Sequence, residues 1–345
     1  MSSLLEIDDL KVYHATPRGL LRAVDGVSLR IGEGEILGLV GESGCGKSTL
    51  ARCVVGLTNP TAGSLAVDGR SDHAAMNRPA RARTIQMIFQ DPVSSLNPRH
   101  CVGDVLDLAF RMRGLTGRSE RQARIDALIR RVGLTPDHLA RFPHEMSGGQ
   151  CQRVGIARAL AMEPRLIVCD EPVSALDVSV QAQVLNLFLD LQNSLGLSYL
   201  FISHDLSVVR YVSTHIAVMY LGRIVEVGPA EAVWHGHRHP YTRALMSSAP
   251  TVDISGERLM LSGDVPSPVS PPSGCAFRTR CPFAEEICAS KTPLLAPVAS
   301  GHLAACHFAD RLFARSTSTH HGKEDRHAPQ ASRRGADRPE PAARY

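Results

Sequence analysis

The sequence predicts an α/β fold built around a parallel sheet whose strand ends lead into polar residues. Three short apolar runs support this prediction, namely Ile36–Val40, Leu166–Cys169 and Leu200–Ser203, and polar residues follow each of them at once. Continuous apolar runs of this length are typical of strands that are buried on both faces of a sheet. In open α/β sheets the active groups lie beyond the carboxyl ends of such strands.

Other parts of the chain have different patterns. Val24–Ile31 and Ser64–Gly69 are typical of short β-strands between Gly and Asp turns, whereas residues 102–160 have helical periodicity. The segment Arg121–Val132, for example, should place its apolar residues on one helix face; these are Ala123, Ile125, Leu128, Ile129 and Val132. After Trp234 the chain becomes rich in Pro, Ser, Gly and Cys, and Gly263–Gly274 is expected to be an ordered, Pro-rich connection.

Composition limits the classes of protein that the chain can belong to. Of its 345 residues, 43% are apolar and 21% charged, and the net charge of +4 is too small to indicate nucleic acid as a partner. No apolar stretch reaches the roughly 18 residues that a membrane-spanning helix needs. The N-terminus lacks the basic and apolar regions of a secretory signal, so we expect folding in the cytosol, where the nine cysteines remain thiols.

The first buried run ends in a glycine-rich loop, GESGCGKST at residues 41–49, which matches the pattern GxxxxGK[ST]. Its backbone N–H groups can surround the phosphates of ATP, Lys47 can reach the β- and γ-phosphates, and Ser48 can bind Mg²⁺. A chance lysine in a Gly-rich turn is the alternative, which the preceding strand disfavours. The predicted binding residues of the loop are Gly41, Ser43, Gly44, Cys45, Gly46, Lys47, Ser48 and Thr49.

Two acidic residues end the second buried run, LIVCDE, 123 residues after Lys47. We expect Asp170 to hold Mg²⁺ through water and Glu171 to polarise the attacking water as a general base. Adjacent acids also cap helices or lie solvated at strand ends, but a phosphate loop in the same chain favours the catalytic interpretation.

A third motif, MSGGQ at residues 146–150, resembles the signature LSGGQ of ABC transporter ATPases and lies 20 residues before Asp170. The resemblance implies that Ser147, Gly148, Gly149 and Gln150 bind a γ-phosphate at a helix N-terminus. One departure follows it: Cys151 stands where the family commonly has a basic residue.

Further motifs of this family appear in the expected order. Gln90 matches the Q-loop, which contacts Mg²⁺ and the attacking water and senses the transmembrane partner. Asp177 ends the D-loop SALD, which communicates across the dimer, and His204 matches the switch histidine that contacts the γ-phosphate. Tyr13 resembles the aromatic residue that stacks on adenine, although a tyrosine in a strand can also serve packing alone.

The resemblance covers about residues 4–310 and implies a P-loop NTPase (RecA-like) α/β core. It also implies an N-terminal antiparallel β subdomain and an inserted α-helical signature subdomain at about residues 95–160. We therefore expect an ABC ATPase domain at 1–233, a Cys-containing extension at 234–310 and a disordered tail at 311–345. In this family the signature faces the phosphate loop of a second ATPase subunit, so that two ATP molecules lie between the two chains.

Four longer runs resemble the ATPases of dipeptide and oligopeptide importers: FQDPVSSLNPR at 89–99, EPVSALDVSVQAQVLN at 171–186, FISHDLSVV at 201–209 and HPYTRAL at 239–245. The LNPR run is most like the second, F-type ATPase of such pairs. The resemblance implies a heterodimer with another ATPase, two transmembrane permease subunits, a solute-binding protein and a position at the cytoplasmic face of the membrane.

Other interpretations stay open at this point. Related importers carry nickel, glutathione or short saccharides, and an ATPase subunit rarely contacts its cargo. Two more distant alternatives are a non-transport ABC protein that acts on DNA or ribosomes, and a redox-sensing module for which ATP hydrolysis is secondary. Neither the long coiled-coil insertions nor the tandem ATPase halves of the former are present.

A cluster of four cysteines, Cys275, Cys281, Cys288 and Cys306, follows the Pro-rich stretch. Four thiolates can hold an iron–sulfur cluster or a zinc ion, although the CxxC pairs of zinc ribbons are absent. The spacing resembles the C-terminal extension of peptide-importer ATPases, which implies a [4Fe–4S] cluster. Zinc and free thiols remain the alternatives.

Overall fold

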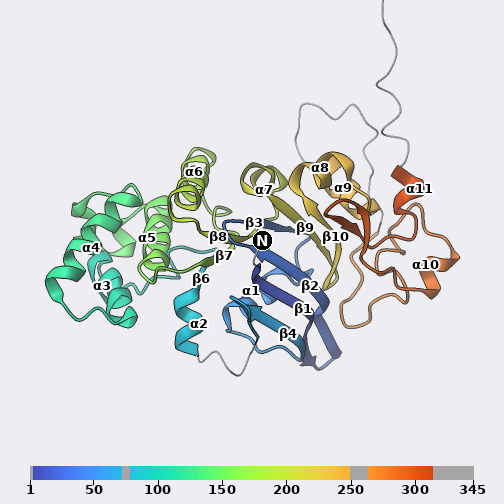
Figure 1. Cartoon of the computed structure of the whole chain (residues 1–345), viewed down its shortest axis with the longest axis horizontal. Helices are drawn as coiled ribbons and strands as arrows, with labels where there is room; N and C mark the ends of the chain where they lie inside the picture. Colours follow the sequence, from blue (N-terminus) through green and yellow to red (C-terminus); the bar gives the residue numbers. More distant parts are fainter. Residues whose placement is uncertain (1–2, 72–77, 249–262, 314–345) are drawn as a thin grey trace, which may run out of the picture.

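The computed structural model describes residues 3–71, 78–248 and 263–313. Two sheets form its framework (Figure 1). The smaller sheet is antiparallel, has the order β2-β1-β4-β5 and corresponds to the predicted N-terminal β segments. Its strands are β1 (Ser3–Thr16), β2 (Gly19–Gly32), β4 (Ala62–Val67) and β5 (Arg70–Ser71).

The larger sheet has the order β11-β12-β10-β9-β3-β8-β7-β6. The five strands from β9 to β6 pair in parallel, whereas β10, β12 and β11 join antiparallel. The strands are β3 (Ile36–Val40), β6 (Ile85–Ile88), β7 (Leu166–Asp170), β8 (Ser198–Ile202), β9 (His215–Tyr220), β10 (Arg223–Pro229), β11 (Ala296–Ala299) and β12 (His302–Ala304). Every residue of β3, β7 and β8 is buried, as the three apolar runs predicted.

Helices cover the sheets and extend to one side of them. The α-helices are α1 (Lys47–Val55), α2 (Arg78–Thr84), α3 (Val102–Arg113), α4 (Arg118–Arg131), α5 (Gly148–Leu160), α6 (Val178–Leu195), α7 (Leu206–Val212), α8 (Ala230–Gly236), α9 (Pro240–Ser248), α10 (Glu286–Ser290) and α11 (Ala309–Phe313). Helices α3 and α4 lie at one end of the molecule, and α10 and α11 lie at the opposite end (Figure 1). The segment with predicted helical periodicity therefore forms a helical lobe.

One detail of that periodicity prediction is wrong. Within α4 the side chains of Ile125, Leu128 and Ile129 are buried in the core, whereas Ala123 is exposed. The buried stripe instead includes Arg121, whose Nε donates to Asp107 Oδ1 at 2.5 Å and whose Nη1 donates to Thr116 O at 2.6 Å. Because its donors are satisfied by acceptors on α3 and the following turn, an arginine replaces an apolar residue at this contact.

The C-terminal region continues the main sheet. Strand β12 pairs with β10 through Leu303 and Ala304, and the buried Glu226 carboxylate on β10 accepts a hydrogen bond of 2.7 Å from His302 Nε2 on β12. The Pro-rich segment 263–274 has no regular secondary structure, but it is fixed to β2 because Arg22 N–H donates to Pro268 O at 3.3 Å. Of the predicted tail, residues 311–313 belong to α11, and the rest lies outside the described residues.

Within the described ranges, no helix combines the length and the apolar character that crossing a bilayer requires.

Candidate functional site

Four neighbouring strands bring the predicted ATP-site residues together. Strands β3, β8, β7 and β6 are adjacent and parallel, so their carboxyl ends lie along one edge of the sheet. The phosphate loop follows β3, His204 follows β8, Glu171 follows β7 and Gln90 follows β6. This edge is where an open parallel sheet presents its ligand-binding residues.

The phosphate loop turns tightly between β3 and α1. Helix α1 begins at Lys47, whose buried Nζ donates to the carbonyls of Gly41 at 2.7 Å and Glu42 at 3.0 Å. Gly46 has φ +110°, and a Cβ at this position would lie 2.1 Å from the carbonyl oxygen of Ala23. The loop conformation therefore requires glycine at position 46.

The remaining predicted residues of the loop lie in the same turn. Cys45 is buried behind it, 3.8 Å from Lys47 Nζ, and burial raises the pKa of its thiol. A thiol with a raised pKa is a poor nucleophile, which argues against a reactive Cys45. The other members of the predicted set are Gly41, Ser43 and Gly44 in the loop and Thr49 in the first turn of α1.

Ser48, in the first turn of α1, contacts Asp170 at the end of β7. Ser48 Oγ donates to Asp170 Oδ1 at 3.0 Å. Burial raises the pKa of the Asp170 carboxyl, and the neighbouring Glu171 adds to this effect, whereas the Ser48 hydrogen bond opposes it. A hydroxyl and a carboxylate at this distance are the oxygen donor set that Mg²⁺ prefers, so the residues present fit a magnesium ion.

Glu171 lies at the centre of the second group. Its Oε2 accepts a hydrogen bond of 3.0 Å from Gln90 Nε2 and lies 3.1 Å from His204 Nδ1. The residue has φ +51°, which a non-glycine residue rarely adopts. Its N–H is held by Ile202 O at 2.9 Å, so the chain bends sharply between β7 and the following turn and directs the carboxylate toward both partners.

Tyr13 lies on β1 at the other side of the phosphate loop. Its hydroxyl donates to Asp25 Oδ1 on β2, and Asp25 Oδ2 accepts a hydrogen bond of 2.7 Å from Arg223 Nη2 on β10. Burial and the Asp25 carboxylate raise the pKa of Tyr13 to about 12. The Tyr13 hydroxyl is therefore fixed by the Asp25–Arg223 ion pair, which no sequence pattern indicates.

The signature residues lie at the beginning of α5. Ser147 caps this helix, because its Oγ accepts from Gln150 N–H at 3.3 Å while Gln150 Oε1 accepts from Ser147 N–H at 3.0 Å. Gly149 allows close packing on α6, since an added Cβ would lie 2.4 Å from Val180 Cγ1. Among the described residues, no hydrogen bond or ion pair joins Ser147–Gln150 to the phosphate loop of the same chain.

Two residues beside these motifs have clear positions. Asp177 precedes α6 without capping it by its side chain, and Ser174 Oγ donates to Glu171 O at 3.0 Å, which links the D-loop to the catalytic turn. Cys151 is fully buried in the core beneath α5, and its thiol donates to Pro143 O at 3.4 Å. The unusual cysteine therefore has a packing role in this chain.

The four C-terminal cysteines line one small pocket together with His239 and Phe277. The N–H of Cys275 donates to Cys288 O at 2.8 Å, and burial raises the pKa of Cys281 to about 11 and that of Cys306 to about 12. Within the part of the chain that the structure describes, no group of three or more His, Cys, Asp or Glu side chains could hold a metal ion. The four cysteines therefore lie around one pocket, but their side chains are not arranged as a metal site.

The site also contains contacts that the sequence reasoning missed. Glu42 in the phosphate loop pairs with Arg280, and its N–H donates to the hydroxyl of Tyr241 at 2.8 Å. Both partners belong to the C-terminal region. The HPYTRAL run, which includes Tyr241, resembles the importer ATPases, but its local pattern does not indicate a contact with the phosphate loop.

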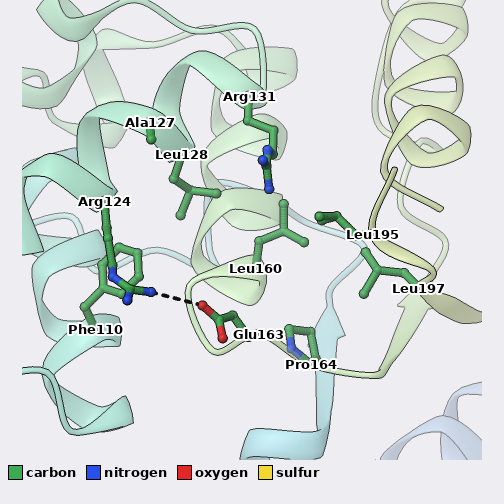
Figure 2. A pocket seen from close by; sticks show the side chains of 10 residues that line it. All are labelled: Phe110, Arg124, Ala127, Leu128, Arg131, Leu160, Glu163, Pro164, Leu195 and Leu197. Carbon is green, nitrogen blue, oxygen red and sulfur yellow. Dashed lines mark hydrogen bonds and ion pairs between the residues drawn. The ribbon is translucent and has the colours of Figure 1, made fainter. Parts of the chain in front are cut away.

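A larger cavity lies away from this site, between α4, the end of α5 and the beginning of β8 (Figure 2). It is lined by apolar side chains such as Leu128 and Leu160, and Arg124 Nη1 forms an ion pair of 3.2 Å with Glu163 across its mouth. None of the predicted ATP-site residues lines it. The catalytic assignment therefore depends on the strand ends and not on this cavity.

Comparisons with known proteins agree with this geometry. The ABC transporter family model matches residues 24–174, and the model for the oligopeptide/dipeptide transporter C-terminal region matches residues 225–288. The chain is 52% identical over 308 residues to the oligopeptide transport ATP-binding protein OppF of Escherichia coli, covering 85% of this chain and 92% of that protein. It is 46% identical over 319 residues to AppF of Bacillus subtilis, covering 88% and 97%.

Solved structures extend the agreement to the fold. The dimeric ATP-binding cassette MJ0796, in a post-hydrolysis state bound to ADP and phosphate, matches with a TM-score of 0.60 and 27% identity, over 66% of this chain and 98% of that one. The cassette cbiO1 of Clostridium perfringens matches with a TM-score of 0.61. The expected α/β cassette fold is therefore confirmed. The chain belongs to the ABC transporter ATP-binding proteins that carry the oligopeptide/dipeptide transporter C-terminal region.

Proposed function

We propose that this chain is the ATP-hydrolysing subunit of an ABC importer that moves dipeptides and oligopeptides into the cell. The observation that carries the proposal is the group formed by Glu171, Gln90 and His204 beside the Ser48–Asp170 pair. This constellation fits the hydrolysis of a nucleoside triphosphate, in which most of the catalysis is positioning and charge stabilisation.

Each residue of the group has a distinct task in this proposal. Glu171 accepts a proton from the attacking water, and Gln90 and His204 orient its carboxylate and contact the transferred phosphoryl group. Ser48 and Asp170 hold Mg²⁺, which when bound offsets charge on the phosphate oxygens. Lys47 and the loop amides hold the phosphates, and Tyr13 stacks on the adenine.

The complete site requires a second ATPase subunit. Among the described residues, no hydrogen bond or ion pair joins the signature Ser147–Gln150 to the phosphate loop of the same chain, although a capped helix N-terminus suits a γ-phosphate. We infer that it faces the loop of a partner chain, so that ATP contacts both and favours the closed pair. The resemblance of the LNPR run to the second, F-type ATPase of importer pairs supports a heterodimer with a different ATPase.

A groove beside the Q-loop is suited to a permease. It is lined by Gln86 on β6, by Ser95 and Asn97 after Gln90, and by α3, where Leu108 and Met112 are 48% and 66% exposed. Exposed apolar residues grouped in one groove indicate a protein partner. We infer that a cytoplasmic helix of one of the two permease subunits binds here, with this chain at the cytoplasmic face of the membrane.

The cargo assignment has a separate basis. The C-terminal family model is defined by oligopeptide and dipeptide transporters, and the relatives OppF and AppF are both described as oligopeptide transport proteins. A solute-binding protein outside the membrane would select the peptide. Nickel, glutathione and other small solutes are the alternatives, because an ATPase subunit rarely contacts its cargo.

A reconstitution experiment tests this function. The chain is assembled in proteoliposomes with its neighbouring permease, ATPase and solute-binding subunits, and uptake of a labelled tripeptide is measured with and without ATP. We expect ATP-dependent uptake that Glu171→Gln abolishes, with loss of turnover of about a hundredfold or more, and that Glu231→Gln on the surface of α8 leaves intact. Uptake of nickel or glutathione in place of the peptide would reassign the cargo, and unaltered turnover in Glu171→Gln would refute the catalytic assignment.

We also propose that the four-cysteine pocket holds a [4Fe–4S] cluster. Zinc is the alternative, since four thiolates can hold a zinc ion as well. An iron–sulfur cluster spaces its four thiolates around a larger inorganic core, which suits four cysteines that line a common pocket. The ligands of this cluster would be Cys275, Cys281, Cys288 and Cys306. The cluster would either stabilise the fold of the extension or supply redox chemistry.

Anaerobic purification tests this assignment. The protein should be brown, with a broad absorbance band in the visible blue and with iron and acid-labile sulfide in equal amounts. Cys275→Ser should lose the band, whereas Cys101→Ser, outside the pocket, should keep it. A colourless protein that contains zinc, or one that contains no metal, would contradict the proposal.

A further inference from the structure

Within the described ranges, the hydrogen bonds between the C-terminal region and the phosphate loop all involve one residue, Glu42. The guanidinium of Arg280 donates to both oxygens of the Glu42 carboxylate, from Nη1 to Oε2 at 2.7 Å and from Nη2 to Oε1 at 2.9 Å. The hydroxyl of Tyr241 accepts a hydrogen bond of 2.8 Å from the Glu42 N–H. Side chain and backbone of one loop residue are thus fixed by two residues that follow it by 199 and 238 positions.

This ion pair differs from an ordinary surface salt bridge. The Arg280 side chain is 7% exposed and that of Glu42 is 26% exposed, and the contact is bidentate. The Glu42 carboxylate raises the pKa of Arg280 still further above its usual range. Bidentate arginine–carboxylate pairs with little exposure hold a defined geometry, whereas exposed ion pairs contribute little to stability.

The two partners are themselves rigidly placed. Tyr241 is completely buried, with its ring 4.7 Å from that of Tyr220 and 5.4 Å from that of Phe277. Phe277 precedes Arg280 in the same turn, because Arg280 N–H donates to Phe277 O at 3.0 Å. An aromatic cluster of Tyr220, Tyr241 and Phe277 therefore holds both the hydroxyl and the guanidinium against the loop.

Glu42 in turn determines the geometry around the phosphate-binding lysine. Its carbonyl accepts a hydrogen bond of 3.0 Å from Lys47 Nζ and one of 3.3 Å from Cys45 N–H. A carboxylate in a loop that binds a polyanion would also repel the phosphates unless a cation neutralised it. Arg280 supplies that cation.

We propose that Arg280 and Tyr241 are positioning residues for ATP binding, through which the C-terminal extension holds the phosphate loop ready for the triphosphate. They act through Glu42 and do not contact the nucleotide. A loop that is already ordered loses less conformational entropy when ATP binds, and a neutralised Glu42 repels it less. The proposal depends on ATP binding by this chain and not on the identity of the cargo.

The test measures the affinity of the full chain for ADP with Mg²⁺ by calorimetry, together with KM and kcat for ATP and the melting temperature. In Arg280→Gln we expect the Kd and KM to rise about tenfold, the cost of about 1.4 kcal/mol, while kcat changes less than twofold. The control Arg311→Gln breaks the Arg311–Glu285 ion pair elsewhere in the extension and should leave the KM unchanged.

Two further variants separate positioning from stability. Tyr241→Phe keeps the aromatic packing and loses only the hydroxyl, so we expect a threefold to fivefold rise in Kd with little change in melting temperature. The exchange Arg280→Glu with Glu42→Arg restores an ion pair and should recover most of the affinity. The proposal is overturned if Arg280→Gln and Tyr241→Phe both bind ADP like the unaltered chain, or if both lower only kcat and the melting temperature.

Discussion

The hydroxyl of Ser48 donates to the carboxylate of Asp170 at 3.0 Å, although 122 residues separate them in the chain. The contact joins the beginning of α1 to the end of β7, so it links the phosphate-binding loop to the acidic strand end. One oxygen belongs to the phosphate loop and the other to the LIVCDE run, and each of these motifs predicted a magnesium ligand.

Loss of the Asp170 charge should weaken magnesium binding. We expect Asp170→Asn to raise the Mg²⁺ concentration for half-maximal ATP turnover by about 10- to 100-fold, as is usual for a group that acts on a metal through water. A magnesium titration of turnover measures this. Asp190→Asn, at an exposed position on α6, is the control; an unshifted titration in Asp170→Asn would contradict the assignment.

Tyr13 should contribute through its ring and not through its hydroxyl. Base stacking on an aromatic residue contributes about 1–3 kcal/mol, so Tyr13→Ala should weaken ATP binding roughly tenfold or more. Tyr13→Phe keeps the ring and should bind within about twofold of the original affinity. Equal losses in the two variants would show that the hydrogen bond to Asp25 matters instead; Tyr211→Ala, at an exposed residue of α7, provides the baseline.

The buried His239 should make the protein less stable in mild acid. Burial lowers its pKa from 6.5 to about 4, and its Nδ1 accepts a hydrogen bond of 3.1 Å from Tyr241 N–H, which requires the neutral ring. Between these two pKa values the unfolded chain binds a proton that the folded chain does not, so stability falls as the pH falls. From pH 7 to 5 this residue should cost about 2 kcal/mol.

Urea unfolding at several pH values measures the effect, with His239→Asn expected to flatten the acid decline. His215 gives a control of opposite sign. Its pKa is raised by the hydrogen bond to Glu35, so its stabilising contribution is present in acid and is lost as the pH rises through the folded-state pKa. His215→Asn should therefore steepen the acid decline, and parallel curves for all three proteins would exclude both assignments.

Two glycines of α5 should respond oppositely to the same substitution. An added Cβ at Gly149 would lie 2.4 Å from Val180 Cγ1, whereas one at Gly155 would meet nothing within 4 Å. We expect Gly149→Ala to destabilise the protein by about 1–3 kcal/mol through overpacking, and Gly155→Ala to stabilise it by up to about 1 kcal/mol through helix propensity. Urea midpoints compare them, and equal shifts would rule out close packing of α5 on α6 as the cause.

The sequence predicted those features that local pattern determines. Strand β3 has the predicted bounds, and the convergence of Gln90, Glu171 and His204 follows from their positions after adjacent parallel strands. The Arg280–Glu42 pair could not be predicted in this way. Both residues lie in turns, where no periodicity marks a partner, and only the packing of Phe277 and Tyr241 brings them together.

Helix α4 shows that periodicity is also an incomplete guide to burial within a single helix. Periodicity correctly placed Ile125, Leu128 and Ile129 in the core, but it cannot recognise that a charged residue also faces inward. Arg121 is buried because Asp107 and a backbone carbonyl satisfy its donors. The buried face of α4 therefore includes Arg121 and excludes Ala123.

The pair between Glu42 and Arg280 also has a consequence for the order of synthesis. The ribosome releases the phosphate loop early, whereas the arginine that fixes it and the strand β12 that extends its sheet emerge more than 200 residues later. During translation the phosphate loop is therefore formed before Arg280 can fix Glu42. Full affinity for nucleotide should therefore appear late, when the segment around Arg280 docks, and incomplete chains should bind ATP more weakly than finished subunits.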